Sequence, residues 1–207
     1  MRRVSPMKVL IAVALVMATA LNAWADTEDP KVCVENAVNG IIKVLEARED
    51  SSRLTEGDRD KIRKVVAGRF DYREMSKRSL AQAWGDISET ERVNFTELFR
   101  KLLERSYGNR LAGFRDQKVT FNDAQFKGDK ARVITSVVDA EKTTPVEYRL
   151  HQTPTGWQVY DIKIEGVSLV SNFRKDFQEG IKQNGGFAGL VQALEKKVRN
   201  LEEKDNA

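Results

Sequence analysis

The sequence has 207 residues, with 35 lysine and arginine side chains, 31 acidic side chains, one histidine and one cysteine. Residues 1–25 hold three of the basic side chains and no acidic one, so residues 26–207 carry 32 basic and 31 acidic side chains, a net charge of +1. This near balance argues against nucleic-acid binding, which needs a concentrated cationic face. A single cysteine also excludes an internal disulfide.

The first 25 residues predict a cleaved secretory signal peptide. Arg2, Arg3 and Lys8 form a positive start, Val9 to Leu21 is an almost unbroken apolar run, and Ala23-Trp24-Ala25 is a small-x-small cleavage site. The run is shorter than the ~20 residues that a membrane-spanning helix needs. We therefore expect residues 26–207 to form a soluble exported domain of the periplasm, with an uncleaved membrane anchor as the alternative.

Two helices are predicted at the start of that domain. Pro30 suits a first helical turn, and apolar residues then recur at helical spacing through Leu45. Cys33 lies on this stripe and is expected to act as a small buried apolar side chain. A shorter helix follows, with Ile62 on its apolar side. The opposite side is expected to face solvent, and it carries Arg59, Lys61, Arg63 and Lys64.

The longest predicted helix begins at Ser88-Glu89-Thr90-Glu91. This segment is a capping box, in which the serine oxygen accepts a free backbone amide and the glutamate three residues later reaches back. Apolar residues then continue at helical spacing as far as Leu111. A stripe of this width lines a core or a cavity within it, and periodicity does not separate the two. Its members include Phe95, Leu98, Phe99, Leu102, Leu103 and Tyr107.

After Gly113 the apolar period changes from helical to alternating, which predicts four β-strands. The strands are centred on residues 119–121, 133–137, 146–150 and 157–159, and turn-like segments separate them. Short connections favour an antiparallel meander. The last strand also carries Tyr160, Ile162 and Ile164, so burial on both of its faces is expected.

Two more helices are predicted after Gly166, separated by the pair Gly185-Gly186. Helices, then a four-stranded antiparallel meander, then helices indicate an α+β fold in a single domain, residues 26–207.

The chemistry of an enzyme is largely missing. His151 is the sole histidine, Cys33 lies far from it in sequence, and no nucleophile elbow, phosphate loop or metal-binding cluster of histidines or cysteines occurs. Asp161 beside Tyr160 lies in an apolar strand, where a carboxylate acts either as a base or, more commonly, as a structural ion-pair or capping group.

The segment from Trp157 to Phe177 closely matches a pattern of approximate form W-x-V-Y-D-V-x-I-E-G-V-S-L-V-x-N-Y-R-x-x-F, with isoleucine at 162 and phenylalanine at 173 as apolar replacements. Phe70-Asp71-Tyr72, Trp84 and the stretch from Phe95 to Tyr107 agree as well. By these motifs the chain resembles the MlaC family, the periplasmic phospholipid-binding proteins of the maintenance-of-lipid-asymmetry pathway, also known as toluene-tolerance auxiliary proteins. One departure is Leu80-Ala81, where many members have Leu-Gly.

The resemblance implies a sheet packed against helices around an apolar cavity that accepts phospholipid acyl chains, with no metal, nucleotide or other cofactor. It also implies a monomeric carrier, not an enzyme, that makes transient contacts with an outer-membrane lipoprotein-porin complex and an inner-membrane ABC transporter complex. We expect Arg174 and Lys175 to contact a head group or a partner. The expected cavity residues are Phe95, Leu98, Phe99, Leu102, Leu103, Tyr107, Val137, Tyr148, Leu150, Trp157, Val159, Val167, Leu169, Val170 and Phe173.

Two alternatives stay open at this point. The first is a periplasmic scaffold or adaptor whose apolar stripes all form a tightly packed core without a ligand. The second is a small-molecule hydrolase or isomerase that uses Asp161 and Tyr160.

Overall fold

The computed structural model describes residues 28–140 and 142–206. The predicted signal peptide, residues 1–25, lies outside this range. Within it, the chain forms an α+β domain, as predicted, with helices before and after an antiparallel sheet. The helices are α1 (Pro30–Glu46), α2 (Glu56–Val66), α3 (Tyr72–Leu80), α4 (Ala83–Asp86), α5 (Glu89–Ala112), α6 (Leu169–Gln183) and α7 (Phe187–Asn206). No helix of these residues has the length and apolarity of a membrane span.

The sheet contains the four predicted strands and two short ones that the sequence did not reveal. The predicted strands are β1 (Lys118–Phe121), β3 (Lys130–Val138), β4 (Thr143–Thr153) and β5 (Gly156–Ile164). The additional ones are β2 (Gln125–Lys127) and β6 (Val167–Ser168), which are too short to show an alternating pattern. The strand order is β1-β3-β4-β5-β6, and β2 extends the β1 edge by pairing with β3.

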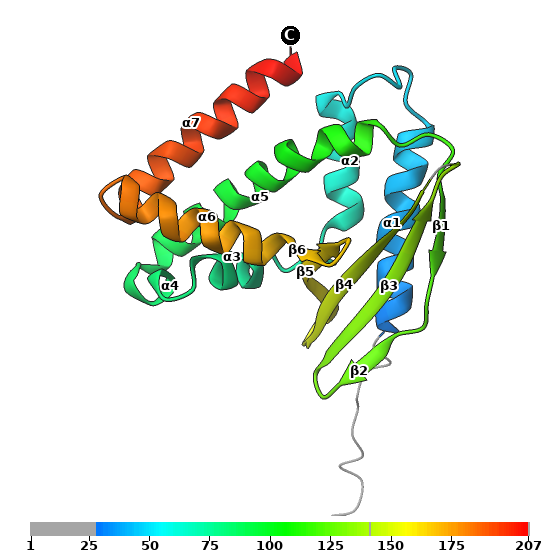
Figure 1. The fold of residues 1–207 in the computed structure, drawn as a ribbon, viewed down its shortest axis with the longest axis horizontal. Helices are drawn as coiled ribbons and strands as arrows, with labels where there is room; N and C mark the ends of the chain where they lie inside the picture. The colour runs from blue at the N-terminus through cyan, green and yellow to red at the C-terminus, as the bar shows by residue number, and fades with distance from the viewer. Residues whose placement is uncertain (1–27, 141, 207) are drawn as a thin grey trace, which may run out of the picture.

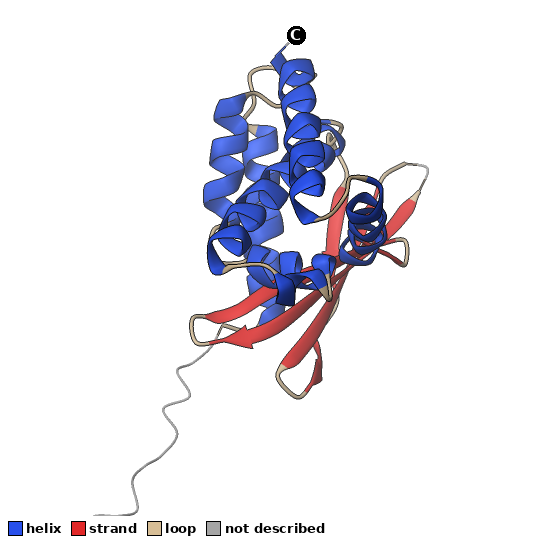
Figure 2. Ribbon diagram, turned by 90° about the vertical axis from the view of Figure 1, so that its left-hand side faces the viewer, coloured by secondary structure: helices blue, strands red, loops and turns tan. Residues whose placement is uncertain are grey.

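The helices divide between one face of the sheet and its β5 end. Helix α1 lies behind the sheet, with α2 beside it, and α3 to α7 gather beyond β5 (Figure 1). The view from that end shows the helical group stacked above the strands (Figure 2). The core of this group is aromatic, because Phe99 makes edge contacts with both Phe173 and Phe177 at centroid distances of 5.0 and 5.3 Å.

Local chemistry explains the helix boundaries. At the start of α5 the predicted capping box is confirmed: Glu91 N donates to Ser88 Oγ, and Ser88 N donates to a Glu91 carboxylate oxygen at 2.7 Å. Gly185 and Gly186 have φ of 73° and 119° between α6 and α7, where a glycine is favoured. Ala81, at the end of α3, also has a positive φ of 52°, which is strained for alanine.

A β-bulge reverses the expected facing of the last strand. Arg149 pairs with Asp161 and Leu150 with Val159, so β5 has one extra residue, Tyr160, at this point. The bulge returns Ile162 and Ile164 to the same face as Val159. The expectation that these isoleucines cover the opposite face is therefore wrong. Burial on that other face comes from Tyr160 and Asp161 instead.

Candidate functional site

The face of the sheet that is turned toward α1 is covered by packed side chains at one end and borders a cavity at the other. At the packed end, Cys33 and Val34 of α1 contact Val133, Leu150 and Val159. At the other end, α1, α2 and α5 stand away from the strands. Together with the sheet they border a half-open cavity of about 580 Å³, which lies within the ~300–1,000 Å³ range of ligand sites.

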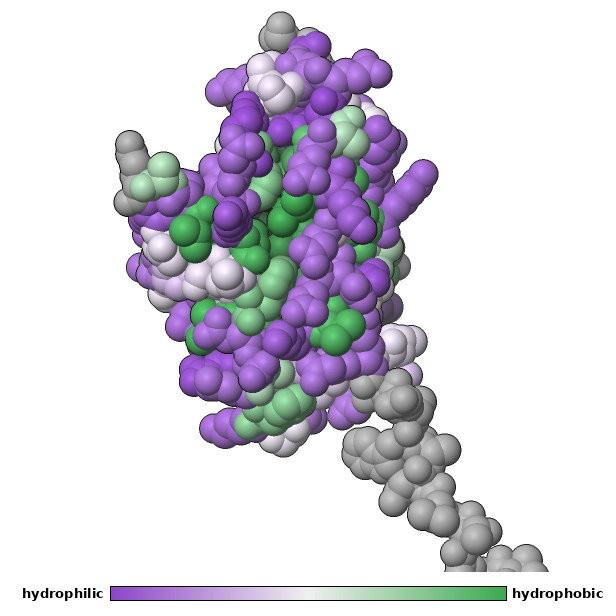
Figure 3. Space-filling view, turned by 90° about the vertical axis from the view of Figure 1, so that its right-hand side faces the viewer, coloured by the Kyte–Doolittle hydropathy of each residue, from purple (hydrophilic) through white to green (hydrophobic). Residues whose placement is uncertain are grey.

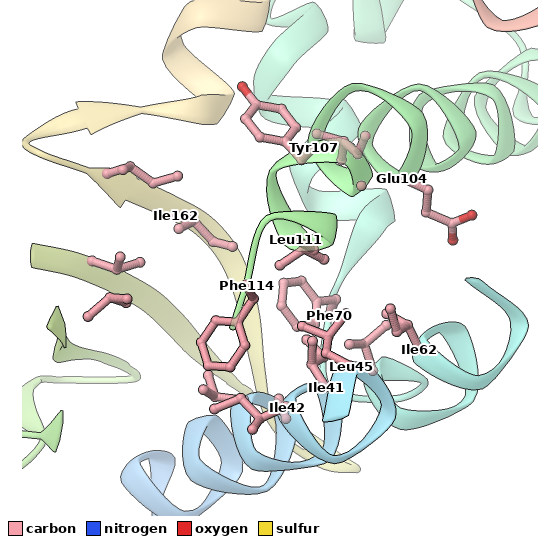
Figure 4. Close-up of a pocket in the computed structure, with 18 of the residues that line it drawn as sticks. Ile41, Ile42, Leu45, Ile62, Phe70, Glu104, Tyr107, Leu111, Phe114 and Ile162 are labelled. Atoms are coloured by element: carbon pink, nitrogen blue, oxygen red, sulfur yellow. The ribbon is translucent and has the colours of Figure 1, made fainter. Parts of the chain in front are cut away.

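Apolar side chains from the sheet and the helices form most of the cavity wall. Cross-strand pairs supply the sheet wall, because Tyr148 faces Ile162 and Val146 faces Ile164 on neighbouring strands. Figure 4 shows the helical side chains converging on the same space from α1, α2 and α5. The helical wall consists mainly of Val38, Ile41, Ile42, Leu45, Ile62, Val66, Leu103, Tyr107 and Leu111.

Two tyrosines of the wall, Tyr72 and Tyr148, are neutral at physiological pH. Burial raises the pKa of Tyr148 to about 12 and that of Tyr72 to about 12. A phenol in such surroundings keeps its proton, because burial disfavours the charged form. The two side chains therefore add hydroxyl groups to the cavity but no charge.

A charged network lies where the cavity passes between α2 and α5. The side chain of Arg59 is 3% exposed and donates to Glu104 O at 3.1 Å and to Asp205 Oδ2 of α7 at 2.7 Å. Arg63 donates to Glu104 Oε2 at 3.0 Å, and this hydrogen bond raises the pKa of Arg63. The expectation that Arg59 belongs to a solvated helix face is wrong. Carboxylates surround these arginines, so this end of the cavity carries no surplus positive charge.

Five of the fifteen expected cavity residues line the cavity: Leu103, Tyr107, Val137, Tyr148 and Leu169. Most of the others belong to the apolar core of the helical group, namely Phe95, Leu98, Phe99, Leu102, Val170 and Phe173. Leu150, Trp157 and Val159 lie under α1 at the packed end of the sheet. Val167 is 51% exposed on β6. Contact of any of these residues with a lipid stays a prediction.

The two expected contact residues lie on α6, away from the cavity wall. Arg174 Nε donates to Arg78 O at 2.8 Å and so ties α6 to the end of α3. Lys175, the next residue, is exposed. Their contact with a head group or partner also stays a prediction.

Sequence reasoning missed most of the helical wall. The stripe of α1 and the apolar side of α2 were visible, but a stripe that faces a cavity has the same spacing as one that faces a core. The isoleucines of β5 were missed because of the bulge. A usable signal lay in residues 113–117, an irregular segment in which Phe114 stands among small and polar residues.

The candidate reactive residues have structural partners. Cys33 is 1% exposed, its Sγ donates to Trp157 O at 3.2 Å, and burial raises its pKa to about 11. Asp161 accepts hydrogen bonds from Ser168 Oγ at 2.7 Å and Val170 N at 3.2 Å, so it caps the start of α6. His151 Nε2 lies 3.0 Å from Asp71 Oδ2, while the other oxygen of Asp71 caps α3.

No metal centre can be built from the part of the chain that the structure describes, since no three His, Cys, Asp or Glu side chains come together as a candidate set. The geometry of the sheet, helices and cavity defines a class of protein: a single-domain α+β fold in which an antiparallel sheet and helices border an apolar cavity.

The family model described as "MlaC protein" matches residues 35–196. The chain belongs to the MlaC family, which confirms the resemblance seen in its motifs.

Named relatives agree with this membership. The toluene tolerance protein ttg2D of Pseudomonas putida is 24% identical over 156 residues, which cover 70% of this chain and 73% of the relative. The intermembrane phospholipid transport system binding protein MlaC of Haemophilus influenzae is 22% identical over 193 residues, 87% of this chain and 86% of the relative.

A solved structure shares the fold. The phospholipid-binding protein from Ralstonia solanacearum, determined in complex with a phospholipid, matches with a TM-score of 0.74 and 25% identity. The match covers 84% of this chain and 99% of that one.

Proposed function

We propose that this protein is a periplasmic carrier that binds the acyl chains of a phospholipid in its cavity and moves the lipid between membranes. The observation that carries the proposal is the apolar cavity of about 580 Å³ between the sheet and helices α1, α2 and α5. The likeness to a protein solved with a bound phospholipid supports it.

The energetics of lipid transfer fit such a site. Each buried methylene contributes ~0.8 kcal/mol, so two long acyl chains gain on the order of 20 kcal/mol before ordering costs. This gain resembles the cost of leaving a bilayer, so the carrier needs apolar surface and little head-group chemistry. The neutral tyrosines and the balanced ion network of the cavity satisfy that requirement.

Membership of the MlaC family supports a role in a transport pathway. We propose that residues 1–25 direct export and are cleaved, and that residues 26–207 act as a monomer without enzymatic activity. The carrier would exchange phospholipid with an outer-membrane lipoprotein-porin complex and an inner-membrane ABC transporter complex, and so maintain outer-membrane lipid asymmetry. Any energy input would come from those partners.

The scaffold alternative requires a tightly packed core, and the cavity is evidence against it. The enzyme alternative needs a free carboxylate at Asp161, whose oxygens instead accept hydrogen bonds at the start of α6.

Native mass spectrometry of the protein purified without detergent tests the proposal. We expect an added mass that organic extraction removes and that lipid analysis identifies as a diacyl phospholipid. A clean polypeptide mass that stays unchanged after incubation with phospholipid vesicles would reject the carrier function.

A further inference from the structure

One wall of the cavity is a single irregular segment, residues 113–117, which joins α5 to β1 and which we call the α5–β1 linker. Gly113, Phe114 and Gln117 line the cavity, and Gly113, Arg115 and Asp116 are exposed to solvent. The cavity is half-open, and this part of its rim is one thickness of chain without helical or strand hydrogen bonding. Such a segment opens at a lower free-energy cost than a helix or a paired strand.

The linker lies on the side of the molecule that also carries α1 and β1 (Figure 1). Apolar side chains gather in the middle of that face, between hydrophilic margins (Figure 3). Phe114 points from the end of α5 toward Ile42 of α1, across the cavity (Figure 4). A displaced Phe114 would join the cavity to this apolar surface.

The passage between α2 and α5 differs from the linker, because ion pairs and hydrogen bonds hold it together. Arg59 fills it, bonded to the backbone of α5 and to a carboxylate of α7, and Arg63 bonds to Glu104. Opening there would leave a buried guanidinium without its partners, which is costly.

Arg48 ties the linker to α1. Its Nε donates to Leu45 O at 2.9 Å, in the last turn of α1, and its Nη1 and Nη2 donate to Ala112 O and Phe114 O, each at 3.3 Å. The planar guanidinium of Arg48 therefore joins the end of α1 to the end of α5 and to Phe114, which lines the cavity. Its fixed fork suits several carbonyl acceptors at once.

Arg115 contacts the same carbonyl oxygens but does not connect them to α1. Its Nη1 donates to Ala112 O at 2.6 Å and to Phe114 O at 2.8 Å. Arg115 belongs to the linker itself, so these bonds move with it. The two arginines thus form a matched pair: both satisfy the end of α5, and Arg48 also holds α1.

We propose that the α5–β1 linker is the gate through which acyl chains enter and leave, and that Arg48 is the positioning residue that holds Phe114 closed against α1. The proposal rests on the carrier function. It assigns to Arg48 control over the rate of lipid exchange, while the apolar wall sets the affinity. Arg48 itself does not line the cavity.

The test measures release of a fluorescent diacyl phospholipid from loaded protein into vesicles of phosphatidylethanolamine and phosphatidylglycerol. Arg48→Gln is expected to raise the release rate constant roughly tenfold, the effect of losing its share of the linker's hydrogen bonds. Arg115→Gln is expected to release lipid at the wild-type rate. Phe114→Ala, which leaves Arg48 in place, is expected to speed lipid uptake as well as release, which a weaker apolar wall alone would not do, and it carries the test if Arg48→Gln does not fold.

Wild-type release rates in Arg48→Gln and Phe114→Ala would overturn the proposal, as would equal acceleration by Arg48→Gln and Arg115→Gln. A failure of the carrier function itself looks different. In that case the wild-type protein takes up no lipid, and no release rate exists to compare.

Discussion

Arg59 of α2 lies directly against Gly108 of α5, where a Cβ atom would overlap Arg59 Nη1. The missing side chain gives the guanidinium room to reach Glu104 O on one side and Asp205 on the other. A glycine within a helix such as α5 costs helix stability. Gly108 is found at this position because any larger residue would overlap the buried side chain of Arg59.

Gly108→Ala is therefore expected to destabilise the protein although alanine is the better helix former. Displacing Arg59 breaks a buried ion pair, and the gain in helix propensity offsets part of that loss, leaving a net cost of roughly 2 kcal/mol. Urea unfolding measures the change. The control is Gly57→Ala in α2, whose Cβ would make an ordinary 3.7 Å contact with Thr55 Oγ1. Equal stability of the two variants would contradict the packing argument.

Ala81→Gly is expected to stabilise the protein by about 1 kcal/mol, because it relieves the positive φ at the end of α3. Leu80-Ala81 is also the one departure from the Leu-Gly pair that the resemblance led us to expect here. Thermal unfolding checks the prediction against Ala83→Gly, at the start of α4, where the same exchange is expected to cost stability. A loss of stability in Ala81→Gly would show that the backbone strain is unimportant.

Val137→Trp is expected to lower phospholipid occupancy at least about tenfold, because the indole fills space that an acyl chain needs. Val137 lines the cavity, whereas Val138, the next residue of β3, points to the other face of the sheet. Val138→Trp is thus the matched control, and native mass spectrometry reports the bound lipid in both. The same occupancy in the two variants would place the lipid outside this cavity.

Stability is expected to fall as pH rises between about 9 and 11 because of Cys33, whose pKa burial raises from 9.0 to about 11. The folded state keeps the thiol proton at a pH where the unfolded chain has lost it, so this contribution is full below pH 9 and disappears toward pH 11. Urea unfolding at several pH values measures the slope. Cys33→Ala should flatten it, and an unchanged slope would assign the loss to other groups.

The order of elements, the α+β class and the MlaC family were predictable because they rest on long patterns. The helical stripe of α5 and the alternation in β3 and β4 involve many residues and tolerate local exceptions. The cavity was less predictable, because Ile41 facing a void and Phe99 facing a core occupy the same kind of helical position.

Two local features account for most of the other differences between the structure and what the sequence predicted. The extra residue in β5 moves Ile162 to the cavity side, and no composition signal marks a bulge of this kind. The burial of Arg59 depends on Asp205, a residue at the far end of the chain. Charge pattern within α2 alone favours a solvated face, so a partner so distant in sequence cannot be inferred from it.

The Arg59–Asp205 pair also constrains the order in which the chain can fold as it is synthesised. Its two residues are 146 positions apart, so a polypeptide that emerges amino end first presents Arg59 long before its counter-charge exists. The passage between α2 and α5 closes when the final turn of α7 arrives. A chain shortened by a few residues at its carboxyl end would keep every strand of the sheet. Without Asp205, however, Arg59 would no longer be held between α2 and α5.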